Sequence, residues 1–315
     1  MDVTNEKISI VVPCYNEEES APLFLAEVLA VMAEIPADFE MIFVDDGSSD
    51  KTLEVLRAAA LEHPEVSYIA LSRNFGKEAA LLAGLEAATG DYVVVMDADL
   101  QHPPSLLPQM YQGIVSEGFD SVAAKRSSRK GEPPVRSFLA RRFYKMMNKI
   151  SDTQMVDGAT DFRMMTRQML DAVLSLKEYN RFSKGLFSWV GFSTKWIDFE
   201  NIPRAAGKTK WSFWKLFMYS IDGLVSFSVK PLAVSSFMGL LFCLLAFGML
   251  VFIVVRWLMF GDPVQGWAST VSVILFVGGI QLFTTGILGQ YLAKSYMESK
   301  GRPIYVVKEK SKKES

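Results

Sequence analysis

Short apolar runs alternate with stretches of helical periodicity through residues 1–210. The residues between the runs place apolar side chains three or four positions apart, as amphipathic helices do. This alternation predicts an α/β fold with a mostly parallel, Rossmann-like sheet and helices on both of its faces. The runs that predict buried strands lie at residues 8–13, 41–44, 66–71, 92–96 and 122–124.

The remainder of the chain is apolar in a different way. Residues 232–255 and 267–293 contain no charged residue, and each segment is long enough to cross a bilayer. Two buried helices of a soluble core would fit that length poorly. Residues 211–230 carry apolar side chains at helical spacing opposite polar ones, which predicts a helix in the membrane interface. We therefore expect a domain at 1–210, an interfacial helix at 211–230, two transmembrane helices within 231–293 and a basic tail at 294–315, with disorder from about Lys308.

Basic residues flank the two apolar segments. In the loop between them, residues 259–266, the only charged residue is Asp262. The positive-inside rule therefore predicts a multi-pass protein of the cell membrane, with the domain and both ends of the chain in the cytoplasm. The flanking basic residues are Lys208, Lys210, Lys215 and Lys230 on one side, and Lys294, Lys300 and Arg302 on the other.

Composition and charge narrow the classes of protein to which the chain can belong. The formal net charge is −2, which does not favour a nucleic-acid partner. The two cysteines, Cys14 and Cys243, predict neither a disulfide framework nor a metal site, and suit a reducing compartment. The first residues lack the basic and apolar regions of a signal peptide.

Two aspartates, Asp97 and Asp99, directly follow the predicted strand at 92–96. Carboxylates one residue apart at a strand end can share a hard divalent cation, and Mg²⁺ and Mn²⁺ prefer such oxygen ligands. A solvated turn is the alternative for so short a motif. Its position favours the metal, because ligands bind beyond the carboxyl ends of parallel strands and a helix begins near Pro103.

Polar residues also follow the first two predicted strands. Tyr15 offers a ring on which a base can stack, next to the backbone N–H groups at a helix start. Asp45 and Asp46 can accept hydrogen bonds from a base or a ribose. Capping of the next helix by Ser48 or Ser49 is an alternative that is compatible with this role.

Taken together, these motifs resemble those of family 2 glycosyltransferases. The resemblance is strongest to polyprenyl-phosphate glycosyltransferases, namely bactoprenol glucosyltransferases and enzymes like dolichyl-phosphate mannose synthases. With the two spans, it covers nearly the whole chain; one departure is Lys208-Thr209, where many relatives carry Glu-Ser. The motifs are PCYNE at 13–17, DDGS at 45–48, RNFGK at 73–77, DADLQHPP at 97–104, DGATDFR at 157–163 and RAAGKTK at 204–210.

The resemblance implies a GT-A fold and transfer of a sugar to a polyprenyl phosphate. Among relatives with two spans, glucose is usually moved from UDP-glucose to undecaprenyl phosphate, so we expect an inverting, metal-dependent hexosyltransferase that uses Mg²⁺ or Mn²⁺. The metal would be bound by Asp99 and Gln101, with Asp97 beside the metal or the donor's ribose. The donor would also contact Pro13, Tyr15, Glu17, Asp45 and Asp46 with its nucleoside and Arg126 with its diphosphate, and the acceptor phosphate would contact Arg204 and Lys210.

Asp157 stands where the family has a catalytic carboxylate, beside Asp99 in the expected active site. A hydroxyl acceptor needs a general base, whereas a phosphate monoester is mostly dianionic at neutral pH. Asp157 can therefore serve as a base, position the acceptor or sugar, or support positive charge at the anomeric carbon. A turn carboxylate before the strand at 162–165 is the structural alternative.

Two other functions share some of these features. A processive polysaccharide synthase would have a Gln-x-x-Arg-Trp motif and more spans, but here Ile253 precedes Arg256-Trp257. An inactive membrane scaffold that only binds nucleotide would not be expected to keep all of the acidic motifs. Gly278, Gly279, Gly286 and Gly289 would allow close approach of helices, either in a homo-oligomer or between the two spans of one chain.

Overall fold

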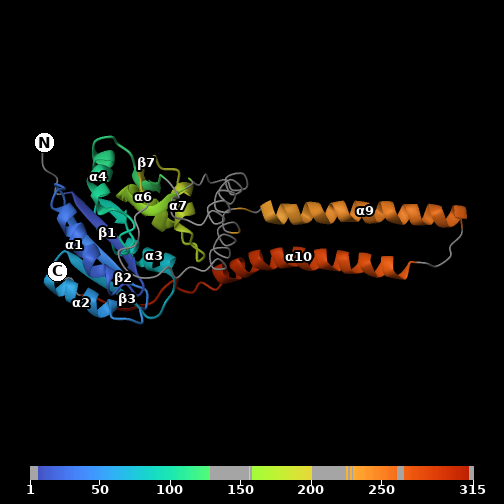
Figure 1. The fold of residues 1–315 in the computed structure, drawn as a ribbon, viewed down its shortest axis with the longest axis horizontal. Coiled ribbons are helices and arrows are strands. Elements are labelled where there is room, and N and C mark those ends of the chain that lie inside the picture. Colours follow the sequence, from blue (N-terminus) through green and yellow to red (C-terminus); the bar gives the residue numbers. More distant parts are fainter. Residues whose placement is uncertain are drawn as a thin grey trace. The chain divides into compact units, whose positions relative to one another are not determined.

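The computed structural model describes residues 6–127, 158–200, 230–260 and 266–311, together with Val156, Val225 and Ser228. The chain divides into two compact units (Figure 1). Unit 1 comprises Met1–Ser220 and Arg302–Ser315, and unit 2 is Ile221–Gly301. The end of the chain therefore belongs to the same unit as its beginning.

Strands of unit 1 form a single sheet in the order β7-β5-β6-β4-β1-β2-β3-β8. The pairings of β1 with β2 and β4, of β2 with β3, and of β5 with β7 are parallel. β6 and β8 run antiparallel to their neighbours. The strands are β1 (Lys7–Cys14), β2 (Asp38–Asp45), β3 (Val66–Leu71), β4 (Tyr92–Val95), β5 (Ser121–Arg126), β6 (Ala159–Thr166), β7 (Thr194–Phe199) and β8 (Val307–Lys310).

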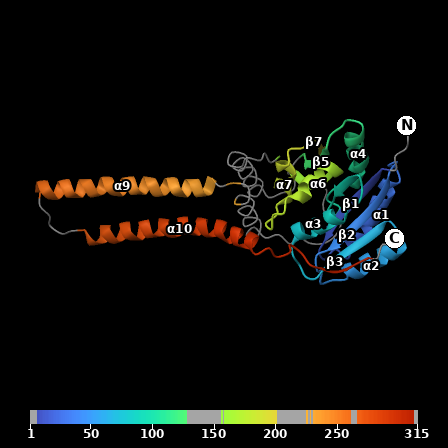
Figure 2. The ribbon, with the colours of Figure 1, turned by 180° about the vertical axis from the view of Figure 1, so that it is seen from behind.

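Helices cover both faces of this sheet, as Figure 2 shows from the reverse side. One face packs against α1 (Ser20–Met32), α2 (Thr52–Glu62) and α4 (Leu107–Val115), which follows the 3₁₀ turn Pro104–Leu106. The other packs against α3 (Lys77–Ala87), α6 (Arg167–Ser175) and α7 (Ser183–Trp189). In β1, Ile8, Ile10 and Val12 enter the first core and Val11 the second, because alternate strand residues point to opposite faces.

The α/β fold with a mostly parallel sheet is confirmed, and the five predicted buried strands and the predicted strand at 162–165 are all present, as β1 to β6. Two strands were not predicted, β7 and β8. Disorder from Lys308 is wrong for the residues up to Lys310, because β8 pairs with the edge strand β3. Its Glu309 forms an ion pair with Arg57 of α2, with an N–O distance of 2.7 Å.

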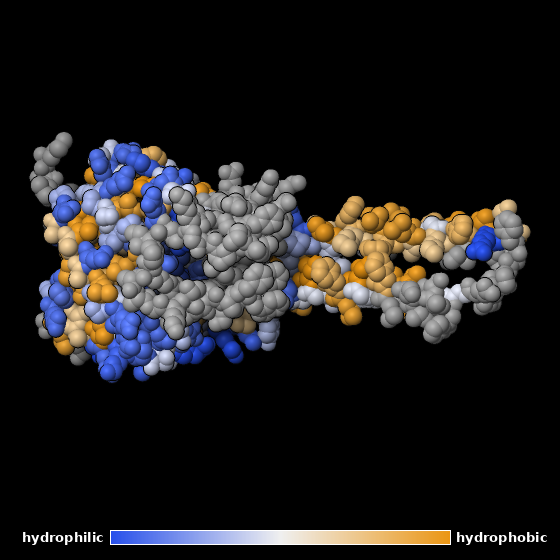
Figure 3. Space-filling model, viewed as in Figure 1, coloured by the Kyte–Doolittle hydropathy of each residue, from blue (hydrophilic) through white to orange (hydrophobic). Residues whose placement is uncertain are grey.

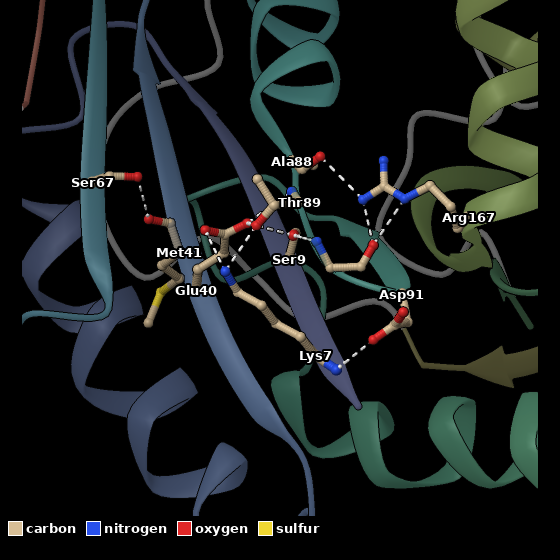
Figure 4. A network of polar contacts seen from close by, with 10 residues as sticks. Lys7, Ser9, Glu40, Met41, Ser67, Ala88, Thr89, Asp91 and Arg167 are labelled. Atoms are coloured by element: carbon tan, nitrogen blue, oxygen red, sulfur yellow. Dashed lines mark hydrogen bonds and ion pairs between the residues drawn. The ribbon is translucent and has the colours of Figure 1, made fainter. Parts of the chain in front are cut away.

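At the amino ends of the parallel strands, a buried carboxylate is enclosed by donors (Figure 4). Glu40 accepts hydrogen bonds from the Ser9 hydroxyl at 2.7 Å and from the Thr89 N–H at 2.9 Å. Its other oxygen lies 3.0 Å from the Lys7 ammonium. Arg167 donates to backbone carbonyls of the turn that precedes β4. These bonds satisfy charged groups within the fold and fix the entry into three neighbouring strands.

Unit 2 contains two long helices, α9 (Lys230–Phe260) and α10 (Trp267–Ser299). They contact each other through Phe242 and Phe276, whose ring centroids are 5.8 Å apart. Large apolar side chains such as Phe237 and Leu282 are exposed along them, and Figure 3 shows this apolar surface. Within the described residues, Lys230–Met249 is long and apolar enough to cross a membrane, judged by length and composition. The predicted interfacial helix at 211–230 falls mainly outside the described residues.

Candidate active site at the carboxyl ends of the strands

The Asp-x-Asp motif lies just beyond β4, at the carboxyl end of the sheet. Asp97 lies 2.6 Å from the ammonium of Lys77. Asp99 is buried and accepts the backbone N–H of Gln101 at 3.1 Å. Leu100 between them has a φ of +56°, a left-handed conformation that is uncommon outside glycine. The turn therefore gives the two aspartates different surroundings.

A third carboxylate reaches the same place from β6. The antiparallel pairing of β4 with β6 sets Val95 opposite Arg163, so Asp161 lies near the end of β4. Its Oδ2 is 2.7 Å from the Lys77 ammonium, which thus bridges Asp97 and Asp161. Neither Lys77 nor Asp161 was assigned a role from the sequence. The available signal was their place in two of the family motifs, RNFGK at 73–77 and DGATDFR at 157–163.

Charge coupling in this cluster outweighs the effect of burial. Burial lowers the pKa of the Lys77 amine, but Asp161 and Asp97 more than compensate and hold that pKa above its usual value. Burial raises the pKa of the Asp161 carboxyl, yet Lys77 and Lys184 hold it below its usual value. The carboxylates and the ammonium are therefore all charged at neutral pH.

Arg126 ends β5 at the same edge of the sheet. Its backbone N–H donates to the carbonyl of Gly158 at 3.0 Å, so it lies next to the residue that follows Asp157. Gly158 has a φ of +80°, and a Cβ there would lie 2.9 Å from the Arg126 carbonyl oxygen. Asp157 itself lies outside the described residues, as do Arg204 and Lys210.

The loops after β1 and β2 are joined to each other. The Asn16 N–H donates to the Ser48 hydroxyl, and the Glu17 N–H donates to the Thr52 hydroxyl, each at 2.8 Å. α2 begins after Lys51, and the Asp50 carboxylate accepts its first N–H, that of Thr52, at 3.0 Å, so the alternative of a cap by Ser48 or Ser49 is wrong. Tyr15, which directly precedes Asn16 and Glu17, is 38% exposed. Its ring is thus partly accessible to solvent.

Asp46 holds a neighbouring loop in place. Its two oxygens accept the backbone N–H groups of Phe75 at 2.7 Å and Gly76 at 2.9 Å. Gly47 has a φ of +64°, and a Cβ there would come within 2.4 Å of the Arg73 backbone. The buried Asp45 accepts the Ser48 N–H at 3.2 Å. The two aspartates therefore build the loops around the expected nucleoside position.

His102 is buried behind the Asp-x-Asp turn. Its ring stacks on Phe162 with centroids 5.5 Å apart and meets Phe199 edge-on at 5.9 Å. These aromatic contacts tie the turn to β6 and β7. The sequence showed only that His102 adjoins Gln101.

Comparison with known proteins decides the family. Residues 9–174, more than half of the chain, match the family described as glycosyl transferase family 2. The chain belongs to glycosyl transferase family 2. This confirms the family expected from the motifs, and with it the expectation of a glycosyltransferase.

Relatives within family 2 match over nearly the full length. The putative glycosyltransferase CsbB of Bacillus subtilis (strain 168) is 45% identical over 96% of this chain and 91% of its own. The bactoprenol glucosyl transferase of Shigella phage SfV is 40% identical over 98% and 100%. A solved structure of glucosyl-3-phosphoglycerate synthase from Mycobacterium tuberculosis, in complex with Mn²⁺, UDP-glucose and phosphoglyceric acid, is similar with a TM-score of 0.47 and 20% identity, covering 69% of this chain and 76% of that one.

The acidic residues of this family 2 site suit a metal that arrives with its nucleotide. Within the described residues, no three acidic, histidine or cysteine side chains converge on a ready-made metal position. Asp99, Gln101 and Asp97 nevertheless offer oxygen atoms within one turn. Mg²⁺ is usually bound through one or two carboxylates together with substrate phosphates and water. The donor set therefore fits a hard divalent cation completed by a diphosphate.

Proposed function

We propose that this family 2 glycosyltransferase moves glucose from UDP-glucose to undecaprenyl phosphate, with inversion at the anomeric carbon. The observation that carries the proposal is the similarity to a bactoprenol glucosyl transferase over the whole of both chains. A match of that extent includes the apolar helices as well as the sheet domain. It therefore favours a lipid acceptor over a soluble one.

The arrangement at the sheet edge supports a donor of this kind. Tyr15 and Glu17 lie in the loop after β1, and Pro13 leads into that loop from the last residues of the strand. Together with Asp45 and Asp46 they form the proposed nucleoside side of the site. Arg126, beside Gly158, is the proposed contact for the diphosphate. The proposed donor contacts thus lie at or just beyond the carboxyl ends of β1, β2 and β5.

The acceptor chemistry needs little proton transfer. A phosphate monoester has a second pKa near 6, so its oxygen can attack as an anion at neutral pH. Attack from the face opposite the leaving diphosphate inverts the configuration, so an α-linked donor gives a β-linked lipid product. We propose that Asp157 positions the acceptor or supports charge at the anomeric carbon, and that Arg204 and Lys210 bind the acceptor phosphate.

A divalent metal at Asp99 and Gln101, with Asp97 beside the metal or the donor's ribose, would neutralise the diphosphate as it leaves. Mg²⁺ and Mn²⁺ both suit oxygen ligands. The protein's own contribution is to hold these ligands in a turn with restricted backbone geometry. The left-handed Leu100 and the Gln101 N–H bond to Asp99 supply that restriction.

Two membrane spans, with both flanks in the cytoplasm, complete the proposal. β8 follows α10 in the chain and is hydrogen-bonded to β3 in unit 1. A chain that leaves unit 1 and later returns to the same sheet must cross a membrane an even number of times. This parity supports two crossings, one by α9 and one by α10, and the basic flanks favour the cytoplasmic side.

A donor screen tests the function directly. Purified full-length protein in detergent would be mixed with undecaprenyl phosphate and, separately, UDP-glucose, UDP-galactose and GDP-mannose, with and without Mn²⁺, and the lipids read by mass spectrometry. We expect a hexose adduct with UDP-glucose and Mn²⁺, and a β linkage by NMR. An adduct only with another donor would overturn the sugar assignment. An α linkage would overturn the single displacement, and free glucose without a lipid product would overturn the acceptor.

A further inference from the structure

The ammonium of Lys77 divides the two carboxylates of the Asp-x-Asp motif into different environments. It lies 2.6 Å from Asp97 Oδ1 and 2.7 Å from Asp161 Oδ2. Asp99, two residues beyond Asp97, instead accepts the backbone N–H of Gln101. A metal that approaches this turn therefore meets one carboxylate that already has a fixed cation.

Hydrogen bonds and packing hold the backbone around Lys77, so its ammonium reaches the two carboxylates from a defined position. Lys77 is the first residue of α3, and Gly76 before it has a φ of +101°. Asp46 accepts the N–H groups of Phe75 and Gly76, and Gly47 packs against the backbone of Arg73. The loop after β2 thereby determines where α3 begins and in which direction the Lys77 side chain points.

Asp161 strengthens the same arrangement from the opposite side. It projects from β6, whose pairing with β4 is fixed by the sheet. An ammonium held between two carboxylates in rigid elements keeps both of them in one orientation, which a single surface ion pair would not achieve. Asp97 is consequently aimed at Lys77, and a metal could take it only in competition with that cation.

We propose that Lys77 is a positioning residue that keeps Asp97 out of the metal's coordination, so that Asp99 binds the metal and Asp97 is left to accept a hydroxyl of the donor. This inference rests on the proposed metal-dependent function. Its physical basis is that a fixed ammonium competes with a divalent cation for the same carboxylate, and charges a few ångströms apart interact strongly near a protein surface. Removing the ammonium should therefore make Asp97 available as an extra metal ligand.

Mn²⁺ binding without donor gives a readout that is independent of turnover. Free Mn²⁺ would be titrated by electron paramagnetic resonance against full-length wild type, K77Q, K77R and the double variant K77Q/D161N. We expect K77Q to bind Mn²⁺ about tenfold more tightly than wild type. K77R keeps the cation and should bind as wild type does. Lys195→Gln, which removes another ion-paired lysine away from the site, is the matched control and should also leave the affinity unchanged.

The double variant distinguishes two causes of tighter Mn²⁺ binding, namely the freeing of Asp97 as a metal ligand and a change in the local net charge. K77Q/D161N removes one cation and one anion, so the local net charge equals that of wild type. The inference predicts that the double variant binds Mn²⁺ as tightly as K77Q, because Asp97 is free in both. A return to wild-type affinity would overturn it in favour of a purely electrostatic effect. The double variant also relieves the carboxylate repulsion that would destabilise K77Q, so the test survives poor folding of the single variant.

Activity then distinguishes this inference from the function on which it rests. With UDP-glucose and undecaprenyl phosphate, K77Q should raise the donor KM, whereas K77R should restore it. Wild type that transfers glucose with Mn²⁺ while K77Q keeps wild-type Mn²⁺ affinity would overturn the role of Lys77 alone. Wild type that transfers glucose fully in chelator would instead overturn the metal-dependent function.

Discussion

The two ends of the sheet handle buried charge in opposite ways. At the amino ends of the strands, Glu40 is surrounded by the hydroxyl of Ser9, the backbone of Thr89 and the ammonium of Lys7. At the carboxyl ends, Asp97 and Asp161 both contact the ammonium of Lys77. The carboxylate of the first arrangement is enclosed by donors of the fold, whereas the carboxylates of the second lie beside the proposed ligand position. We therefore expect acidic residues to serve stability at one end of the sheet and ligand binding at the other.

If the carboxyl end serves a ligand, losing a carboxylate there should affect activity far more than folding. Asp99→Ala should lower glucosyl transfer by about 1000-fold or more, since stabilisation of the leaving diphosphate is worth several kcal/mol. Its melting temperature should stay near that of wild type. Asp171→Ala, at an exposed acidic residue on α6, is the control and should retain activity. A variant at position 99 that keeps near wild-type turnover would remove the metal assignment.

The amino end should show the opposite response. Glu40→Ala leaves the Ser9 hydroxyl and the Thr89 N–H without their acceptor and removes the carboxylate that pairs with Lys7, and should cost about 3 kcal/mol of unfolding free energy. The turnover of the remaining folded enzyme should be unchanged. Glu40→Gln keeps one carbonyl acceptor and should lose less unfolding free energy. Chemical denaturation followed by tryptophan fluorescence would measure both, and a stable Glu40→Ala variant with reduced kcat would reverse the comparison.

Asp161 lies at the carboxyl end of the sheet but should also contribute to stability. It therefore tests how sharply the two roles are divided between the two ends. Because the side chain of Lys77 is 39% exposed, Asp161→Asn should cost only about 1–2 kcal/mol at pH 7. The folded-state pKa of Asp161 is lowered. Its stabilisation is therefore complete above about pH 5 and is lost as the pH falls through roughly 4 and below.

The melting temperatures of wild type and Asp161→Asn should accordingly keep their difference between pH 7 and about pH 5, and converge only as the pH is lowered below about 4. Asp198→Asn is a suitable control, because Asp198 is exposed and lies 3.7 Å from Lys125. A difference between wild type and Asp161→Asn that stays constant down to about pH 2 would mean that the carboxylate's charge does not supply the stabilisation.

The smallest effect is expected where an ion pair lies on the surface, away from both ends. Arg57→Gln breaks the contact with Glu309, in which the arginine side chain is 45% exposed. The cost should be smaller than that of Asp161→Asn, and salt should diminish it. A loss as large as that of Asp161→Asn would show that β8 depends on this pair rather than on its backbone bonds to β3. Melting temperatures at low and high salt would measure it.

The difference between the two ends also explains what the sequence could reveal. Asp97 and Asp99 follow an apolar run directly, so local pattern alone placed them at a strand end. Glu40 sits inside a strand, and only the pairing of β2 with β1 brings Ser9 beside it. Likewise, Asp161 joins Lys77 through the antiparallel pairing of β6, which no local pattern encodes. Contacts between distant segments therefore decided what the sequence missed.

β8 escaped prediction for a related reason. Its segment is short and charged, and it gains its conformation from the exposed edge of β3 rather than from an apolar pattern. The expected roles of Asp157, Arg204 and Lys210 stay predictions, because these residues lie outside the described part of the chain. The family motifs supplied those assignments, and local periodicity supplied none of them.

The position of β8 has a consequence for biosynthesis. The ribosome makes β3 early and β8 last, with both long helices between them in the chain. At about 5–20 residues per second, the edge of β3 waits roughly ten seconds or more for its partner. An uncovered edge strand is a template for pairing with other chains. The nascent protein therefore carries an uncovered edge strand while α9 and α10 are synthesised, and a chain released before residue 307 would keep that edge permanently.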